Sequence, residues 1–322
     1  MSMRILFFGV DVMGEACLSA LLSAGYTVAG VVTLAPPKRS FLQRLFGRKT
    51  PPGVAEIAKR HRVPVLTPKT LRDPAVTRKL EALAPDLLVV ASFDKVLPPE
   101  VLDIATYGGI NVHPSLLPRH RGPAPASRAI WAGDEETGLT VHLLEETVDT
   151  GPILLQHLHP IQPDDNAQRL IRRLAKAAPA ALLEALAGLQ EGSLYPRAQT
   201  GEVTPAPFFS LREGQLDWRA DNAQILQTIR ACSPYPGAFL IARGERLAVL
   251  EASAEEGRQG ASPGTVLSVN ASGILVQTRE GAIRCRKLRR GDRLVPPAQF
   301  GKWAADGDRL KSGNWMPSTP RA

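Results

Sequence analysis

Short apolar runs alternate with segments of helical spacing through the N-terminal part of the chain. Residues 14–24 carry apolar side chains at helical spacing, and the pattern stops near Gly25. Strands are expected at 4–10, 26–33, 63–66, 86–92 and 108–113, and helices at 14–24, 53–61, 70–83 and 124–132. Continuous apolar strands that alternate with helices predict an α/β domain whose parallel sheet is covered on both faces.

The pattern changes further along the chain. Residues 139–145 and 153–161 alternate as more exposed strands do, and 166–189 form a long helical stretch in which Pro179 predicts a break or kink. Residues 195–209 are rich in Pro, Thr and Gly and are interpreted as a linker. After them a helix is expected at 222–232, and turn residues separate short runs typical of a small β-barrel, at 239–242, 247–252, 264–269, 273–278 and 282–288. The predicted organisation is a catalytic domain at 1–194, a linker at 195–209 and a second domain at 210–322.

The composition is that of an ordinary globular protein. Of the 322 residues, 44% are hydrophobic, and a chain of this length favours two domains. Three cysteines far apart in sequence, without a CxxC pair, indicate reduced thiols rather than a disulfide or zinc framework. The N-terminus lacks the features of a signal peptide and no run of about 18 apolar residues is present, so we expect a cytoplasmic protein without a membrane span.

The densest chemical signal is the segment Asn111-Val-His113-Pro-Ser115-Leu-Leu-Pro118, followed by Arg121-Gly122. Side chains two apart on a strand point to the same face, so Asn111 and His113 would project together from the end of a strand, where ligands bind in open α/β sheets. An amide can donate to a developing oxyanion, and an imidazole can carry a proton near neutral pH. An isolated Asn-x-His pair is usually only a turn former, but the two prolines and the glycine that follow fix one loop, which favours function.

A second motif is Val148-Asp149-Thr150-Gly151. Asp-Thr-Gly suits an ordinary β-turn. The functional hypothesis places Asp149 beside His113, where a carboxylate would orient the imidazole and raise its pKa.

Together the two motifs, with Leu216-Asp217-Trp218 and Ser233-Pro-Tyr-Pro-Gly237 further on, resemble the 10-formyltetrahydrofolate-dependent formyltransferases. The resemblance implies a doubly wound, Rossmann-like domain, then a smaller OB-like β-barrel. It implies catalytic positions for Asn111, His113 and Asp149, with protonated His113 and Asn111 stabilising charge on the formyl oxygen. It implies 10-formyltetrahydrofolate as co-substrate and no metal. The folate cleft would be lined by Phe93, Val96, Leu97, Pro98, Ser115, Leu116, Leu117, Pro118, Thr147 and Val148.

The acceptor amine is less specified by these motifs. The net charge of +8 is compatible with solubility alone or with an anionic partner. One basic segment falls where enzymes acting on methionyl-tRNA carry an RNA-contacting loop, and it contains Lys38, Arg39, Arg44, Arg48 and Lys49. A second segment, 279–293, includes Arg284 and Arg286 on one expected strand face, a pattern suited to phosphate contact. The basic segment at 38–49 could instead be a solvated loop or a helix that docks on a membrane or protein.

The resemblance therefore favours methionyl-tRNA as the acceptor. The opening Gly9-Val-Asp-Val-Met-Gly14 departs from the tRNA enzymes and looks more like the formyltransferases that act on nucleotide-linked amino sugars, which remain the alternative. A non-catalytic RNA-binding relic is a third hypothesis, and the intact Asn-His-Asp set argues against it. The glycine spacing at this loop is not that of a dinucleotide-binding site.

Overall fold

The computed structural model describes residues 3–35 and 53–313, which form two compact units. The first unit holds residues up to 123 together with 137–160 and 171–205. The second holds 124–136, 161–170 and the chain from 206 onward. Since each unit gathers segments from separate parts of the chain, neither corresponds to one continuous stretch of sequence.

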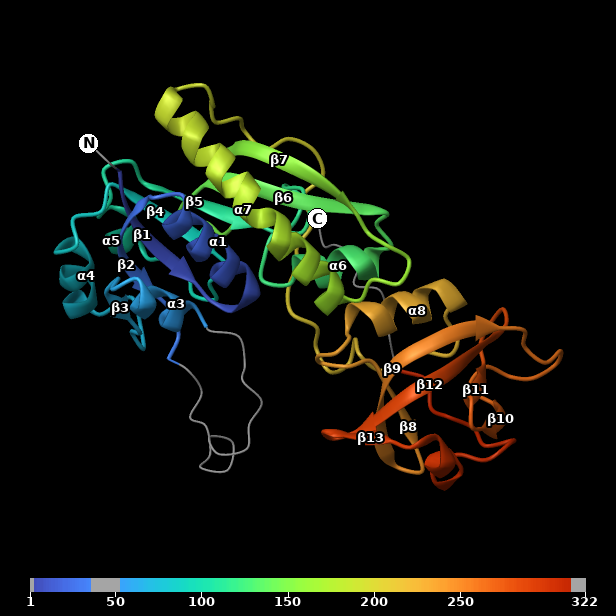
Figure 1. Cartoon of the computed structure of the whole chain (residues 1–322). Helices are drawn as coiled ribbons and strands as arrows, with labels where there is room; N and C mark the ends of the chain where they lie inside the picture. Colours follow the sequence, from blue (N-terminus) through green and yellow to red (C-terminus); the bar gives the residue numbers. More distant parts are fainter. Residues whose placement is uncertain (1–2, 36–52, 314–322) are drawn as a thin grey trace, which may run out of the picture. The chain divides into compact units, whose positions relative to one another are not determined.

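A seven-stranded sheet in the order β3-β2-β1-β4-β5-β6-β7 forms the centre of the first unit (Figure 1). The strands β3, β2, β1, β4 and β5 are parallel, and β6 is antiparallel to β5. The strands are β1 (Arg4–Gly9), β2 (Thr27–Val32), β3 (Val65–Leu66), β4 (Leu87–Ala91), β5 (Gly109–His113), β6 (Glu136–Leu143) and β7 (Ile153–Pro160). The predicted parallel sheet is confirmed for its first five strands.

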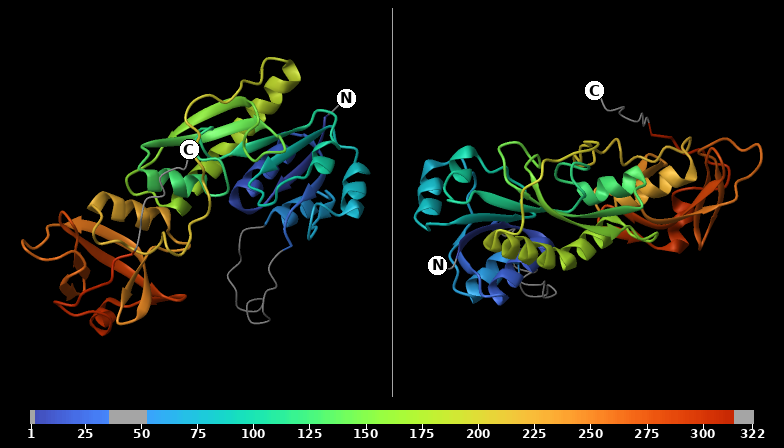
Figure 2. Two further views of the ribbon diagram at one scale, coloured as in Figure 1. Left: turned by 180° about the vertical axis from the view of Figure 1, so that it is seen from behind. Right: turned by 90° about the horizontal axis from the view of Figure 1, so that it is seen from above.

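Helices cover both faces of the parallel part. The helices α1 (Asp11–Ser23) and α3 (Val54–Arg60) contact each other on one face, and α4 (Pro74–Glu81) and α5 (Pro99–Leu102) lie on the other, as Figure 2 shows from above. All five residues of β4 are buried. A strand covered on both faces loses the alternation of apolar and polar residues, which is why its sequence is a continuous apolar run.

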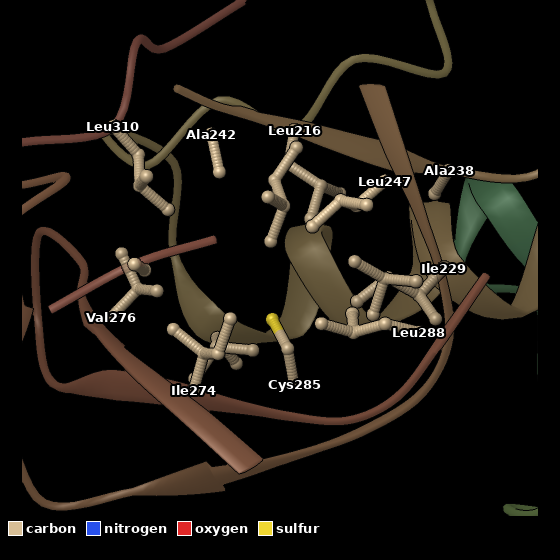
Figure 3. Packing of buried hydrophobic residues seen from close by; sticks show 14 of the residues in the cluster. Leu216, Ile229, Ala238, Ala242, Leu247, Ile274, Val276, Cys285, Leu288 and Leu310 are labelled. Carbon is tan, nitrogen blue, oxygen red and sulfur yellow. The ribbon is translucent and has the colours of Figure 1, made fainter. Parts of the chain in front are cut away.

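The second unit is built on an antiparallel sheet in the order β10-β11-β12-β9-β8, with β13 paired to β12. Its elements are α6 (Pro125–Ala132), α8 (Asn222–Ala231), β8 (Phe239–Ala242), β9 (Glu245–Glu255), β10 (Val266–Asn270), β11 (Gly273–Gln277), β12 (Ala282–Arg290), β13 (Arg293–Val295) and the 3-10 helix η1 (Pro297–Lys302). Apolar side chains of the strands and α8 meet in one core, part of which Figure 3 shows around Cys285. The predicted small β-barrel is thereby confirmed as an OB-like antiparallel fold.

Two features depart from the sequence-based expectations. The helix α7 (Ala167–Glu191) runs through Pro179 without a break. The predicted linker is not a free connection either, because Arg197 forms a β-bridge with Ile153 and Pro205 forms one with Arg121. The exact domain boundaries stay a prediction.

We predict that Leu288→Ala lowers the free energy of unfolding by about 2–5 kcal/mol, the range for removing a buried leucine side chain. Leu288 in β12 is fully buried in the core of the barrel, and the truncation leaves a cavity. The matched control is Leu294→Ala in β13, whose side chain is 57% exposed. Urea denaturation of both variants is the measurement, and equal losses would contradict the assignment of this core.

Candidate functional site

Three predicted side chains meet at the carboxyl end of β5. Asn111 and His113 lie two apart on that strand, and Asp149 lies in the loop between β6 and β7. The Asn111 Nδ2 donates to Asp149 Oδ1 at 3.3 Å, and His113 Nδ1 lies 3.5 Å from Asp149 Oδ2. The residues that the sequence analysis paired only by hypothesis are therefore in direct contact.

A fourth side chain, His142, completes this cluster and was missed by the sequence analysis. It lies on β6 directly opposite Asn111, and its Nε2 is 3.1 Å from Asn111 Nδ2. Its Nδ1 lies 2.8 Å from the Leu143 carbonyl, which can only accept, so Nδ1 carries the proton and Nε2 accepts from Asn111. The 3.6 Å between His142 Nε2 and Asp149 Oδ1 is beyond hydrogen-bond length. The sequence shows a histidine on the alternating strand predicted at 139–145, but only the register between the two strands shows that it lies opposite Asn111.

The Asp149 carboxylate is fixed from several sides. Its Oδ2 accepts from the Gly122 backbone N–H at 2.8 Å, and its own backbone adopts the left-handed region at φ 56°. Burial by itself would raise the pKa of Asp149, but the pKa lies below the usual 3.8, and the Gly122 N–H that donates to the carboxylate is one of the groups that lower it. Gly151 is required nearby, because an added Cβ would stand 1.9 Å from the Leu143 carbonyl oxygen. Asp149 is consequently ionised at neutral pH.

His113 differs from the expectation in its charge. Burial lowers its pKa below 6.5, and the opposing effect of Asp149, which the sequence analysis took as dominant, only reduces that shift. The side chain is 5% exposed, and Nε2 lies 2.9 Å from the His120 carbonyl, to which it donates. The predicted net rise of the His113 pKa is thus wrong, and the resting imidazole is neutral with Nδ1 facing Asp149.

A buried polar network holds the loop that follows β5. Thr140 Oγ1 donates to the Ser115 carbonyl at 2.6 Å and accepts from the Leu117 N–H at 3.1 Å. Gln156 Nε2 donates to the Leu117 carbonyl at 2.9 Å. Because these bonds satisfy the backbone of the loop, its shape is fixed from behind by β6 and β7.

The predicted folate-lining residues fall into two kinds. Ser115, Leu97 and Leu117 are buried, and the Ser115 hydroxyl donates to the Arg119 carbonyl, so these side chains hold loops in place. Phe93 packs edge-on against Phe8 with ring centroids 5.5 Å apart. The side chains of Val96 and Val148 are exposed, at 61% and 48%. Beside Val148, the hydroxyl of Thr150 donates to the Thr147 carbonyl. The loops keep accessible apolar groups while their bases are anchored.

The predicted acceptor-binding residues are only partly described. Lys38, Arg39, Arg44, Arg48 and Lys49 lie outside the described residues. Arg284 is buried and makes a two-point ion pair with Glu255, at 2.7 and 2.8 Å. Arg286 also reaches Glu255, at 3.9 Å, although its side chain is 56% exposed. Arg284 therefore serves the barrel and presents no free charge to a ligand.

Among residues 3–35 and 53–313, no group of three or more His, Cys, Asp or Glu side chains is placed to hold a metal ion. In the same described ranges, no helix has both the length and the apolar character needed to cross a membrane.

Two family models match the chain. The model described as formyl transferase matches residues 3–186, and the one described as formyl transferase, C-terminal domain, matches 210–303. A methionyl-tRNA formyltransferase of Pseudomonas syringae is 40% identical over 287 residues, covering 89% of this chain and 90% of the relative. A methionyl-tRNA formyltransferase of Thermus thermophilus is 37% identical over 311 residues, covering 96% of this chain and 99% of the relative.

Solved structures share the fold. HypX from Aquifex aeolicus, in complex with tetrahydrofolic acid, superposes with a TM-score of 0.66 at 20% identity, covering 98% of this chain and 51% of that one. An N-formyltransferase from Helicobacter canadensis, in complex with folinic acid and dTDP-3-aminofucose, gives 0.65 at 14% identity, covering 89% and 99%. With the family models spanning both parts of the chain and the Asn-His-Asp cluster assembled at the end of β5, this protein belongs to the folate-dependent formyltransferase family.

Proposed function

We propose that this protein transfers the formyl group of 10-formyltetrahydrofolate to the amino group of methionyl-tRNA, using Asn111, His113 and Asp149. The observation that carries the chemistry is the position of the Asp149 carboxylate, which accepts from the Asn111 amide at 3.3 Å and lies 3.5 Å from Nδ1 of the His113 imidazole. The acceptor is supported by identity of 37–40% to enzymes named for it, over nearly the full length of this chain.

The neutral imidazole of His113 suits the acceptance of a proton. Its Nε2 donates to the His120 carbonyl, which leaves the lone pair of Nδ1 directed at Asp149. When the attacking amine loses its proton, Nδ1 can take that proton and the resulting imidazolium pairs with the carboxylate. The proton is then available to the departing nitrogen of the folate, so the transfer is balanced without a net change at the protein.

Asn111 is half-buried, whereas His113 and His142 are buried and the side chain of Asp149 is only 8% exposed. The two N–H groups of Asn111 point to His142 and Asp149, and the bond to Asp149 is the longer at 3.3 Å. The N–H toward Asp149 is therefore the one that can turn to the formyl oxygen as negative charge develops there. His142 keeps the other N–H engaged and fixes the plane of the amide.

The folate supplies an activated formyl group when it is bound. The chain offers it the fixed loop at 115–118, and the exposed side chains of Val96 and Val148. Apolar lining with few polar groups is the usual composition of a small-molecule site. The other folate-lining residues named from the resemblance keep the status of a proposal.

A basic hollow on the OB-like barrel supports an RNA partner better than Arg284 does. Its volume is about 1010 Å³, and the side chains that line it include Tyr235, Trp303, Arg246, Arg289 and Arg293, while Arg290 makes a two-point ion pair with Glu245 in the same hollow. Tyr235 is 85% exposed. Arginines contact phosphates and exposed rings stack on unpaired bases, so both chemistries suit RNA.

The alternative acceptor is a nucleotide-linked amino sugar. It is supported by the fold shared with the enzyme from Helicobacter canadensis and by the sequence of residues 9–14, which span the end of β1 and the first turn of α1. A protein that formylates methionyl-tRNA would act in translation initiation, in the cytoplasm. The deciding assay offers 10-formyltetrahydrofolate with charged initiator tRNA and with amino-sugar nucleotides side by side. Transfer to the sugar alone would refute the proposed acceptor, and transfer to neither would refute the proposed activity.

We predict that Asn111→Ala and His113→Ala each lower kcat by roughly two to three orders of magnitude, the scale for losing a group that stabilises the transition state. Both variants should fold, because their partners are a few polar groups rather than the apolar core. Single-turnover rates at saturating substrate are the measurement. Turnover near that of the unmodified protein in either variant would remove that residue from the catalytic set.

We predict that part of the acid sensitivity of the fold comes from His113. Its folded pKa is depressed below 6.5, so at lower pH the unfolded chain binds a proton that the folded protein refuses. Stability is therefore lost as the pH falls from about 6.5 toward the folded pKa. The loss in unfolding free energy between about pH 7.5 and 5.5 should be smaller in His113→Gln than in the unmodified protein. The control His61→Gln, at an exposed histidine, should leave the loss unchanged, and an equal loss in all three proteins would contradict a buried neutral His113.

We predict that reversing the charges of Arg44, Arg48 and Lys49 weakens RNA binding and flattens the salt dependence of KM for the RNA. Each phosphate contact contributes to the slope of log K against log salt, so losing contacts reduces that slope. The matched control reverses three exposed cations, Arg78 and Lys79 in α4 and Arg72 just before that helix, with the same change in net charge. If both triple variants change the slope equally, overall charge rather than the basic segment at 38–49 governs RNA binding.

A further inference from the structure

The segment at 197–205, predicted as part of a linker, is bonded to two separate loops of the site. Arg197 pairs with Ile153 at the start of β7, through N–H to carbonyl bonds of 2.7 and 2.8 Å. Thr204 accepts from the His120 N–H through Oγ1 at 2.9 Å, and from the Arg121 N–H through its carbonyl at 2.9 Å. The family model of the catalytic domain ends at residue 186, before this segment.

Gln199, in the middle of the segment, uses its whole amide. Nε2 donates to the carbonyls of Asp149 and Gly151, at 2.9 and 2.8 Å. Oε1 accepts from both Nε and an Nη of Arg121, at 3.1 and 2.7 Å. An amide with two donors and one acceptor thus joins the loop after β5 to the loop before β7.

Two of these bonds are made to the backbone of residues in an uncommon conformation. Asp149 and His120 both adopt the left-handed region, at φ 56° and 59°, which is uncommon for residues other than glycine, although Asp and His adopt it more often than most. Such conformations persist only where surrounding contacts fix them. Gln199 bonds the carbonyl of Asp149, and Thr204 bonds the N–H of His120.

The connections form a closed ring around Asp149. Gly122 donates its N–H to the Asp149 carboxylate, and the neighbouring Arg121 is tied through Gln199 to the Asp149 backbone. The side-chain carboxylate of Asp149 is therefore tied to Gly122, and its backbone carbonyl is tied through Gln199 to Arg121, the residue before Gly122. Rotation of Asp149 away from His113 and Asn111 requires that at least one of these bonds break.

We propose that Gln199 is a positioning residue for formyl transfer, which holds the Asp149 carboxylate against His113 and Asn111. This inference rests on the proposed function, since it requires Asp149 to act in the reaction. Gln199 touches none of the reacting groups and acts through Asp149.

The test is a double-mutant cycle on the full-length protein. Gln199→Leu keeps the approximate shape and removes both donors and the acceptor. We expect kcat to fall about 10- to 100-fold, the scale for misplacing a catalytic group by about 1 Å, with KM for 10-formyltetrahydrofolate changed less than about threefold. In the Asp149→Asn background the same substitution should cost less than about twofold, because residues that act through one another are not additive. Glu202→Ala, at an exposed residue of the same segment, is the control and should leave kcat unchanged.

The outcomes distinguish the positioning role of Gln199 from the proposed catalytic role of Asp149. An equal loss of kcat in both backgrounds would assign Gln199 a structural role and overturn the inference alone, as would a Gln199→Leu variant with undiminished kcat. An Asp149→Asn variant with full turnover would overturn the proposed catalytic set and this inference with it. If thermal unfolding shows that Gln199→Leu is not folded, Gln199→Glu replaces it in the same double-mutant cycle. This variant keeps an acceptor for Arg121 and loses both donors.

Discussion

The ionised carboxylate of Asp149 is the charge around which the site is organised. It accepts from Asn111 and from the Gly122 N–H, and it faces Nδ1 of a neutral His113. A carboxylate this poorly exposed is stable only when its oxygens have partners, so the surrounding loops are obliged to keep their donors in place. The rigid loop after β5, the glycine at 151 and the strained backbone at 149 all follow from that requirement.

The strained backbone explains why so much structure lies behind a small reacting centre. Thr140 and Gln156 hold the loop at 115–118, and Gln199 and Thr204 hold the loops that carry Asp149 and His120. A catalytic group needs to be held within a fraction of an ångström, and such accuracy comes from bonds made by residues that never touch the substrate. Polar side chains at the back of the site are accordingly part of its design.

The neutral state of His113 shows burial and charge in competition. A nearby carboxylate favours the imidazolium, but removing the ring from water costs the charged form more. The site is therefore poised before the reaction, with a lone pair on Nδ1 and a negative charge beside it. In the proposed reaction, a proton taken up at Nδ1 would lie beside the Asp149 carboxylate.

The sequence by itself determined the parallel sheet, the small β-barrel and the pairing of Asn111 with His113 on one strand, because these depend on local periodicity and on motifs contiguous in the chain. The apolar run of β4 and the two-residue spacing of Asn111 and His113 are visible without coordinates. Only the tertiary structure decided the parts that depend on pairing between distant segments. Strand register placed His142 opposite Asn111, chain path brought Gln199 to Asp149, the ion pair with Glu255 neutralised Arg284, and burial set the charge of His113. Each of these is fixed by neighbours dozens of residues away, and local patterns carry no information about them.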